Sequence, residues 1–325
     1  MVTRRKIVLL LGVGAIAPLE CFAQSKRPVI IAILIAGSRQ SQGHNLSAFK
    51  EGLADLGWKE GTEFILEIRY AEGHYDRLPA LAKEIANKSP AVIVAAPSQA
   101  VAAISKAAPK SPIVAASGDP LGAGLVSNLA RPGGMITGVT NVVTQVNQKH
   151  LQLLLDAVPG LKRVGFLSDP SNPSNAVMFG GARRAAAQYS VEARFADAAK
   201  AEEIESAITS LDKQGVQALV VMAGALFDSE RQRIVVLATA KRWPSIAGQA
   251  SYAEAGGFLA YGVDRGELYR RSAVYVDKIL KGAKPGDLPI EQPTKFELVV
   301  NMSTAKALGI KIPQSLLVQA TRVIE

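Results

Sequence analysis

Short polar residues recur along this 325-residue chain directly after predicted strands, and they are its strongest candidates for binding a ligand. Almost all are Ser, Asn, Gln, Asp or Gly, which cap helix N-termini and leave backbone N–H groups free. Such helix ends bind carboxylates and phosphates without a fixed cationic side chain. We predict ligand contacts from Gly37, Ser38, Ser98, Gln99, Asp119, Ser168, Asp169, Asn172, Gly224, Gln249 and Asp264.

Each member of this set also has an ordinary structural role open to it. Capping of a helix or a turn is a sufficient role for Ser98 or Ser168. Asp119 precedes Pro120, so it is either a turn residue or an acceptor for a ligand ammonium group. Asp264 precedes a predicted helix, and the N-cap and ligand roles are equally open. The whole set is stronger evidence for a ligand site than any single member, because polar loops at the same end of two sheets predict a cleft between them.

The chain offers little for catalysis or for a metal. His44, His74 and His150 lack the spacing of metal sites. The only cysteine, Cys21, precedes the predicted cleavage site, so thiol chemistry and disulfides are excluded from the mature chain. There is no G-x-S-x-G motif, and Gly122–Gly124 lacks the third glycine of a dinucleotide loop. We predict no enzyme activity, no metal and no cofactor.

The first 23 residues are typical of a signal peptide, with a basic start, an apolar run over Ile7–Ala17 and small residues before Gln24. The apolar run is shorter than the roughly 20 residues needed to span a bilayer. We therefore predict a soluble protein exported to the periplasm and cleaved near Ala23-Gln24. Glu20 before Cys21 disfavours a lipoprotein signal. The export route, Sec or twin-arginine, stays open.

The net charge is basic but evenly distributed. It is +9 for the whole chain and +7 once Arg4, Arg5, Lys6 and Glu20 leave with the signal peptide. Lys and Arg are scattered and are not gathered with aromatic residues into a stripe. We interpret them as solvated surface and predict no nucleic-acid partner.

The hydrophobic pattern supplies the elements that must position these loops. Val29–Ala36 is an apolar, β-branched run without alternation, typical of a strand buried on both faces of a parallel sheet. A helical pattern follows it, and strands alternating with helices predict an α/β fold with right-handed crossovers. Further strands are predicted over Phe64–Tyr70, Ala91–Ala96, Ile113–Ala116, Arg163–Leu167, Ala193–Phe195 and Ala218–Met222.

The mature length of about 300 residues predicts two domains, because one hydrophobic core seldom organises so long a chain. We predict one lobe from residues 24–140 with about 256–288, and a second from 141–255 with about 289–325. A tail that returns to both halves makes a multi-strand hinge, and hinge-bending closure is the motion this permits.

Three long motifs carry a resemblance to a known family. They are Gly118–Thr140, Tyr261–Pro285 and Leu288–Leu298, which resemble a signature of ABC-transporter substrate-binding proteins of the TrpX-like group. The likeness spans the mature chain and implies a type I periplasmic-binding-protein fold, two Rossmann-like lobes with a ligand between them. One departure is Met135, which stands where the family usually has Asn.

The resemblance implies capture of a small solute for an inner-membrane ABC permease by a protein that we expect to be a monomer. We predict a carboxylate-bearing ligand, an amino acid or aromatic acid, held by the turns after Pro97 and Ser168. Asp119 or Asp264 is expected to accept an amino group. A sensory module with the same cleft is the alternative, and an exported enzyme is less favoured. Tyr70, Tyr252 and Phe227 are candidates for ligand stacking, although we expect at least two of them to be core.

Overall fold

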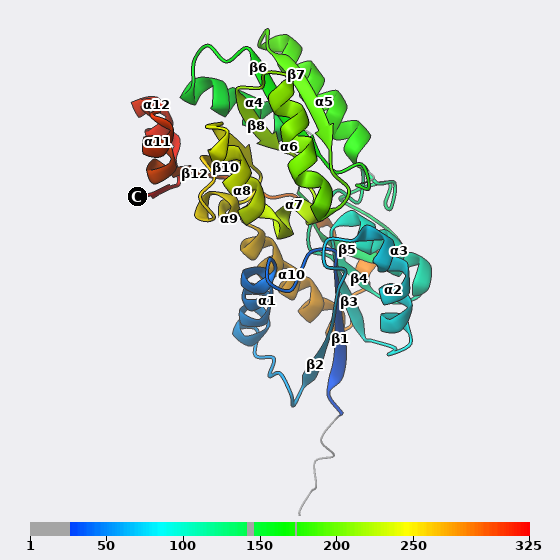
Figure 1. Ribbon diagram of the computed structural model, residues 1–325. Helices are drawn as coiled ribbons and strands as arrows, with labels where there is room; N and C mark the ends of the chain where they lie inside the picture. The colour runs from blue at the N-terminus through cyan, green and yellow to red at the C-terminus, as the bar shows by residue number, and fades with distance from the viewer. Residues whose placement is uncertain (1–26, 142–145, 173) are drawn as a thin grey trace, which may run out of the picture.

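The computed structural model describes residues 27–141, 146–172 and 174–325, which form two α/β lobes, each built around its own sheet (Figure 1). The predicted class of fold, two Rossmann-like lobes with parallel sheets, is confirmed. The predicted signal peptide, residues 1–23, lies outside the described residues. Within the described part of the chain, no helix combines the length and apolarity needed to cross a bilayer.

The first sheet has the strand order β11-β5-β4-β3-β1-β2, and all its neighbouring strands are parallel. Its strands are β1 (Val29–Ile35), β2 (Phe64–Tyr70), β3 (Val92–Ala96), β4 (Ile113–Ala115), β5 (Ile136–Val139) and β11 (Ile290–Glu291). Helices α1 (Gly43–Asp55) and α10 (Arg265–Leu280) cover one face. Helices α2 (Leu78–Ala86) and α3 (Ser98–Ala107) cover the other.

Strand β1 shows why this lobe is encoded by continuous apolar runs. Ile31 and Ile33 pack in the core beneath α1 and α10, whereas Ala32 and Leu34 pack beneath α2 and α3. All four side chains are fully buried because successive residues of a strand point to opposite faces and both faces are covered.

The second sheet has the order β13-β12-β10-β9-β8-β6-β7, parallel except for the antiparallel pair β10 and β12. Its strands are β6 (Arg163–Ser168), β7 (Glu192–Asp197), β8 (Ala218–Val221), β9 (Ser245–Ala247), β10 (Leu259–Gly262), β12 (Glu297–Asn301) and β13 (Arg322–Ile324). The helices around it are α4 (Val146–Ala157), α5 (Asn175–Gln188), α6 (Ile204–Lys213), α7 (Ala225–Ser229), α8 (Arg231–Ala240), α9 (Ala250–Glu254), α11 (Met302–Leu308) and α12 (Gln314–Gln319). Helices α4, α5, α11 and α12 pack on one face, and α6 and α8 on the other.

The chain changes lobe between β5 and α4, between β10 and α10, and between β11 and β12. Two strands lie in the opposite lobe from the one predicted. Strand β10, within the predicted 256–288 segment of lobe 1, pairs with β9 and β12 in the second sheet. Strand β11, within the predicted 289–325 segment of lobe 2, pairs with β5 in the first. Backbone pairing fixes the lobe of so short a strand, and its sequence carries no pattern that reports the partner.

Candidate functional site

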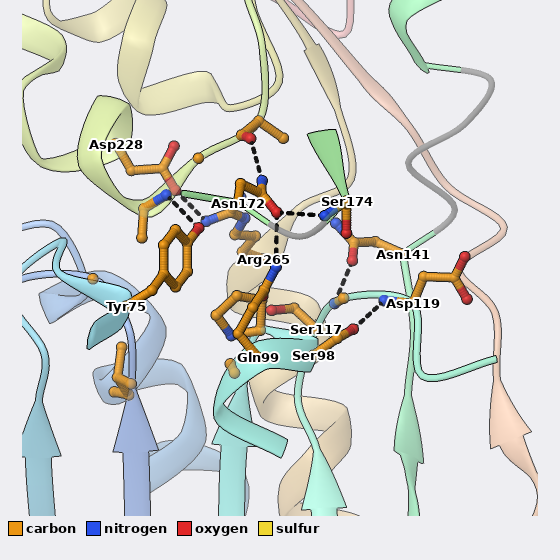
Figure 2. A pocket seen from close by; sticks show the side chains of 18 of the residues that line it. Tyr75, Ser98, Gln99, Ser117, Asp119, Asn141, Asn172, Ser174, Asp228 and Arg265 are labelled. Atoms are coloured by element: carbon orange, nitrogen blue, oxygen red, sulfur yellow. Dashed lines mark hydrogen bonds and ion pairs between the residues drawn. The ribbon is translucent and has the colours of Figure 1, made fainter. Parts of the chain in front are cut away.

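A cavity of about 70 Å³ lies between the two lobes (Figure 2). The loops that follow β1, β3, β4 and β5 reach it from the first sheet, and the loops that follow β6 and β8 reach it from the second. In that order they contribute Gly37, Ser98, Ser117, Asn141, Asn172 and Gly224. The carboxyl ends of the strands are where ligands bind in open parallel sheets, so this cavity is the candidate ligand site.

Two long helices begin at the cavity, one from each lobe. Helix α3 starts at Ser98, and the N-cap residue of α5, Ser174, lines the cavity from the opposite side. The first N–H groups of a helix have no intrahelical acceptor and carry partial positive charge. The Ser98 hydroxyl accepts the Asp119 N–H at 2.7 Å, which fixes the start of α3 to the loop after β4. This end of the cavity is therefore suited to an anionic group.

Among the described residues, two hydrogen bonds between uncharged side chains or backbone groups join the lobes at the cavity. Gln99 Nε2 of the first lobe donates to Asn172 Oδ1 of the second at 2.7 Å. The Ala225 N–H of the second lobe donates to the Tyr75 hydroxyl of the first at 3.1 Å. Because both contacts cross from lobe to lobe, the structure has the closed arrangement of the two lobes.

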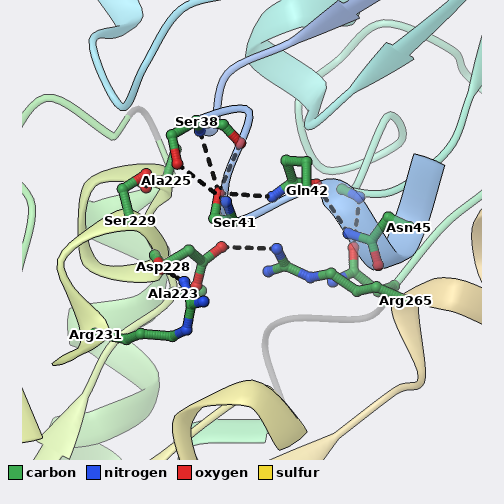
Figure 3. A network of polar contacts seen from close by, with 12 residues as sticks. Ser38, Ser41, Gln42, Asn45, Ala223, Ala225, Asp228, Ser229, Arg231 and Arg265 are labelled. Atoms are coloured by element: carbon green, nitrogen blue, oxygen red, sulfur yellow. Dashed lines mark hydrogen bonds and ion pairs between the residues drawn. The ribbon is translucent and has the colours of Figure 1, made fainter. Parts of the chain in front are cut away.

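Arg265 and Asp228 form the ion pair of the cavity. Arg265 opens α10 of the first lobe, Asp228 lies in α7 of the second, and Nη1 and Oδ2 are 2.7 Å apart. Their side chains are 21% and 18% exposed. Gln42, from the loop after β1, lines the same cavity as this pair, and all three residues are labelled in Figure 3. A guanidinium has five N–H donors and a carboxylate two oxygens, so this contact leaves both groups able to bind a ligand.

The cavity also contains neutral hydrogen-bonding groups. Gln99 Oε1 is buried and has no hydrogen-bond partner among the described residues. Burial raises the pKa of the Tyr75 hydroxyl, which therefore stays protonated near neutral pH. Since this hydroxyl accepts the Ala225 N–H, its own proton is left to donate. A ligand thus meets an amide acceptor and a phenolic donor on the first-lobe side.

Six predicted residues line the cavity, namely Gly37, Ser98, Gln99, Asp119, Asn172 and Gly224. Asp119 lines the cavity, but its Oδ1 accepts the Gly122 N–H at 2.8 Å. Its carboxylate points away from the centre of the group in Figure 2. Of the two roles open to Asp119, the structure shows the turn role.

Ser168 and Asp169 follow the second-lobe strand β6 but lie outside the cavity lining. Ser168 is fully buried and donates its hydroxyl to Asp197 on the neighbouring strand. Asp169 is 1% exposed, and its Oδ1 accepts the N–H and hydroxyl of Ser171. Burial raises the pKa of Asp169, and hydrogen bonds from Ser171 oppose the shift. Asp169 thus stabilises the turn that brings Asn172 to the cavity, whereas Ser168 joins β6 to β7.

Ser38, Gln249 and Asp264 also lie outside the cavity lining. Ser38 and Ser41 exchange hydrogen bonds within their own loop (Figure 3). Gln249 lines a cavity of about 30 Å³ that shares Ala223, Asp228 and Arg265 with the 70 Å³ cavity. Asp264 caps α10 by accepting the Glu267 N–H at 3.2 Å and faces a groove at the lobe crossing. The N-cap role is the one that the structure shows for Asp264.

Several polar or charged cavity residues are absent from the predicted set, namely Gln42, Tyr75, Ser117, Asn141, Ser174, Asp228, Arg265 and Tyr269. Asp228 follows Gly224 by four residues, and i,i+4 spacing puts it on the same side of the short helix α7. Arg265 is the neighbour of Asp264. A prediction that includes the first helical turn after each loop contains both Asp228 and Arg265. Tyr75 begins a three-residue 3-10 helix (Tyr75–Arg77) and Asn141 lies in the loop after β5, and neither segment is long enough to show a hydrophobic period.

Two α/β lobes closed over a polar cavity at their strand ends define a bilobal binding protein of the type I periplasmic class. The family model for ABC transporter substrate binding proteins matches residues 30–324, and the chain belongs to this family. The resemblance drawn from the sequence motifs is thereby confirmed.

Individual proteins are similar to this chain in sequence or in fold. A tyrosine-binding protein of Clostridioides difficile (strain R20291) is 24% identical over 264 residues, which cover 81% of this chain and 76% of the relative. An ABC domain from Streptococcus pneumoniae in complex with L-Trp is 25% identical, with a TM-score of 0.84 over 91% of this chain and 100% of that one. A conserved domain protein from Vibrio cholerae O1 biovar El Tor has a TM-score of 0.86 at 24% identity, with 91% and 100% covered.

Proposed function

We propose that this protein binds an amino acid between its lobes, in the periplasm, and delivers it to an inner-membrane ABC permease. The observation that carries the proposal is the pairing, within one closed cavity, of two helix N-termini with the carboxylate of Asp228. An amino acid carries one negative and one positive group, and this cavity offers a partner for each. The relatives described as tyrosine-binding and as an L-Trp complex support the same ligand class.

The ligand carboxylate lies at the start of α3, in this proposal, close to the N-cap of α5. The Ser98 and Gln99 N–H groups begin α3, and the N-terminal dipole favours an anion there. Gln99 and Asn172 hold the two helix starts together through their 2.7 Å hydrogen bond. The proposal therefore retains the predicted location of the ligand carboxylate, at the turns after Pro97 and Ser168.

The ligand ammonium group is assigned to Asp228, in place of Asp119 or Asp264. Asp119 accepts a hydrogen bond within its own turn, and Asp264 caps α10. The Asp228 carboxylate has neither role and lies at the cavity. Gln99 Oε1, a buried acceptor with no partner among the described residues, supplies a second contact for an ammonium N–H. Charge-assisted hydrogen bonds of this kind are about twice as strong as neutral ones.

Closure of the lobes is the signal that a permease reads in this scheme. A ligand that contacts both lobes stabilises the closed arrangement over the open one, because only the closed one provides all its contacts. The predicted signal peptide, residues 1–23, places this cycle outside the inner membrane.

Calorimetry on the mature chain, residues 24–325, tests the proposal with L-amino acids and two sets of truncated analogues. Tyramine and tryptamine lack the carboxylate, and the matching phenylpropionic and indolepropionic acids lack the ammonium group. We expect at least one free amino acid to bind, and its analogues to bind at least about tenfold more weakly, because each leaves one charged partner unmatched. Binding of a neutral sugar with no heat from any amino acid would reject the proposal.

A further inference from the structure

A second cavity of about 40 Å³ adjoins the ligand cavity, and we call it the side cavity. The two cavities share the lining residues Asn141, Ala223 and Arg265. The side cavity extends towards α4 and the lobe crossing, where it meets His150 and Phe296. It is large enough for the end of a side chain and too small for a whole amino acid.

Two buried polar atoms in the side cavity have no partner among the described residues. They are Asn147 Nδ2 and His150 Nδ1, whose residues are 3% and 2% exposed. Asn147 and His150 are three residues apart on α4, so they lie on the same side of that helix. Unpaired buried polar groups are rare in folded proteins because each costs the full desolvation of the atom.

The hydrogen on His150 is fixed by its other nitrogen. His150 Nε2 lies 2.7 Å from the carbonyl oxygen of Tyr261, and a carbonyl can only accept, so Nε2 carries the proton. Burial lowers the pKa of His150 to about 4, which keeps the ring neutral in the periplasmic range of pH. Nδ1 is therefore an acceptor, whereas Asn147 Nδ2 is a donor.

A hydroxyl satisfies both atoms through a single oxygen. It donates its proton to His150 Nδ1 and accepts from Asn147 Nδ2, whereas a carboxylate has no proton to donate and an ammonium has no lone pair. The Phe296 ring forms part of the wall and is held by stacking on Tyr261, with centroids 5.6 Å apart and planes at 11°. This wall suits a flat, apolar group that carries the hydroxyl.

We propose that the side cavity is a specificity subsite for a hydroxylated aromatic side chain, whose hydroxyl bridges Asn147 Nδ2 and His150 Nδ1. The inference rests on the proposed function, because the amino acid's charged groups must occupy the ligand cavity for its side chain to pass Asn141 and Arg265. Asn147 and His150 then determine which amino acid is preferred.

Gly248 provides a way to fill the side cavity without disturbing its polar atoms. A Cβ at this position has a single heavy atom within 4 Å, His150 Cε1 at 3.9 Å, which is ordinary van der Waals contact. Gly248→Ala therefore narrows the space for the ligand hydroxyl while the protein keeps its backbone and its hydrogen bonds.

The experiment measures L-tyrosine and L-phenylalanine, which differ only in the hydroxyl, by calorimetry on the mature chain. We expect L-tyrosine to bind at least about tenfold more tightly, since phenylalanine leaves both polar atoms unpaired. Asn147→Ala is expected to weaken tyrosine binding by about tenfold and to change phenylalanine binding by less than about twofold. Gly248→Ala is expected to weaken tyrosine binding by a similar factor, with an unchanged melting temperature without ligand.

The outcomes separate this inference from the proposed function. Equal affinity for the two amino acids, or an Asn147→Ala effect that is the same for both, overturns the subsite and indicates a cavity filled by water alone. The amino-acid function survives that result. Failure of every amino acid to bind rejects both. Should Asn147→Ala fail to fold, Gly248→Ala decides, because an unaltered tyrosine-to-phenylalanine ratio in that variant also overturns the subsite.

Discussion

Arg265 Nη1 and Asp228 Oδ2 lie 2.7 Å apart although the two residues belong to helices of opposite lobes. Separation of the lobes breaks this pair, so it belongs to the closed arrangement. Its side chains are 21% and 18% exposed, so the pair is mostly buried, and the cost of desolvating the two charges offsets much of their attraction. The pair therefore permits opening when no ligand is bound, and the ligand must supply the remaining free energy of closure.

Asp228→Asn is expected to weaken amino-acid binding by at least about tenfold, because it removes the charge that faces the ligand ammonium group. Calorimetry with the tightest-binding amino acid measures the loss. Asp119→Asn is the matched control, since it also removes a carboxylate at the cavity while an Asn keeps the capping contact with Gly122. Equal affinities of the two variants would exclude Asp228 as the ammonium partner.

Tyr75→Phe is expected to weaken ligand binding by about fivefold, because closure then leaves the Ala225 N–H without its acceptor. Small-angle scattering at saturating ligand should show a larger radius of gyration than for the unaltered protein at the same ligand concentration. Tyr70→Phe is the control, since its ring lies under the Arg39 guanidinium at 5.5 Å, a contact that phenylalanine retains. Tyr75→Phe behaving like this control would remove Tyr75 from the closing contacts.

Strands within continuous apolar runs were predictable, including the short β4 and β8, whereas β5, β9 and β11 were not. Strands such as β1 are buried on both faces and are written as runs of five or more apolar residues. Strands β5, β9 and β11 have four, three and two residues, too few for a hydrophobic period to show.

Phe227 and Tyr252 are 2% exposed in the second-lobe core, so the interpretation that at least two of the aromatic candidates are core is confirmed.

The placement of the candidate site was predictable only to the level of its loops. Ser98 and Ser168 both stand at the end of a strand, but Ser98 opens a helix at the cavity whereas Ser168 is still paired within its sheet. The difference depends on where each strand stops, by one or two residues, which a sequence pattern does not resolve. Asp228 is missed by a search for polar residues in the loops after strands, because it lies within a helix and its carboxylate reaches the cavity from there.

His150 makes stability depend on pH. Its pKa is lowered to about 4 in the folded protein from an ordinary value of 6.5, because burial disfavours the charged ring. Between these values the unfolded chain binds the extra proton, so the free energy of unfolding rises with pH through this window and falls on acidification. The loss below pH 4 is on the order of 3 kcal/mol.

Urea unfolding between pH 4.5 and 7 measures this dependence as the difference between the unaltered protein and His150→Gln. We expect the difference to shrink as the pH falls, because the variant has no imidazole to protonate. The exposed His74 supplies the control variant His74→Gln, which should follow the unaltered protein throughout. If the free energies of unfolding of His150→Gln and the unaltered protein fall in parallel with decreasing pH, this ring does not cause the loss of stability in acid.

Gly118→Ala is expected to reduce both stability and ligand affinity, because Gly118 has a φ of +99° and an added Cβ comes within 2.5 Å of Ser98 N. Gly124→Ala, at a φ of +68° with no heavy atom within 4 Å, carries only the left-handed strain of about 1 kcal/mol. Urea unfolding and calorimetry of both variants separate strain from collision. Since Ser98 N opens α3, an unchanged affinity in a folded Gly118→Ala protein would place the ligand carboxylate elsewhere than at the start of this helix.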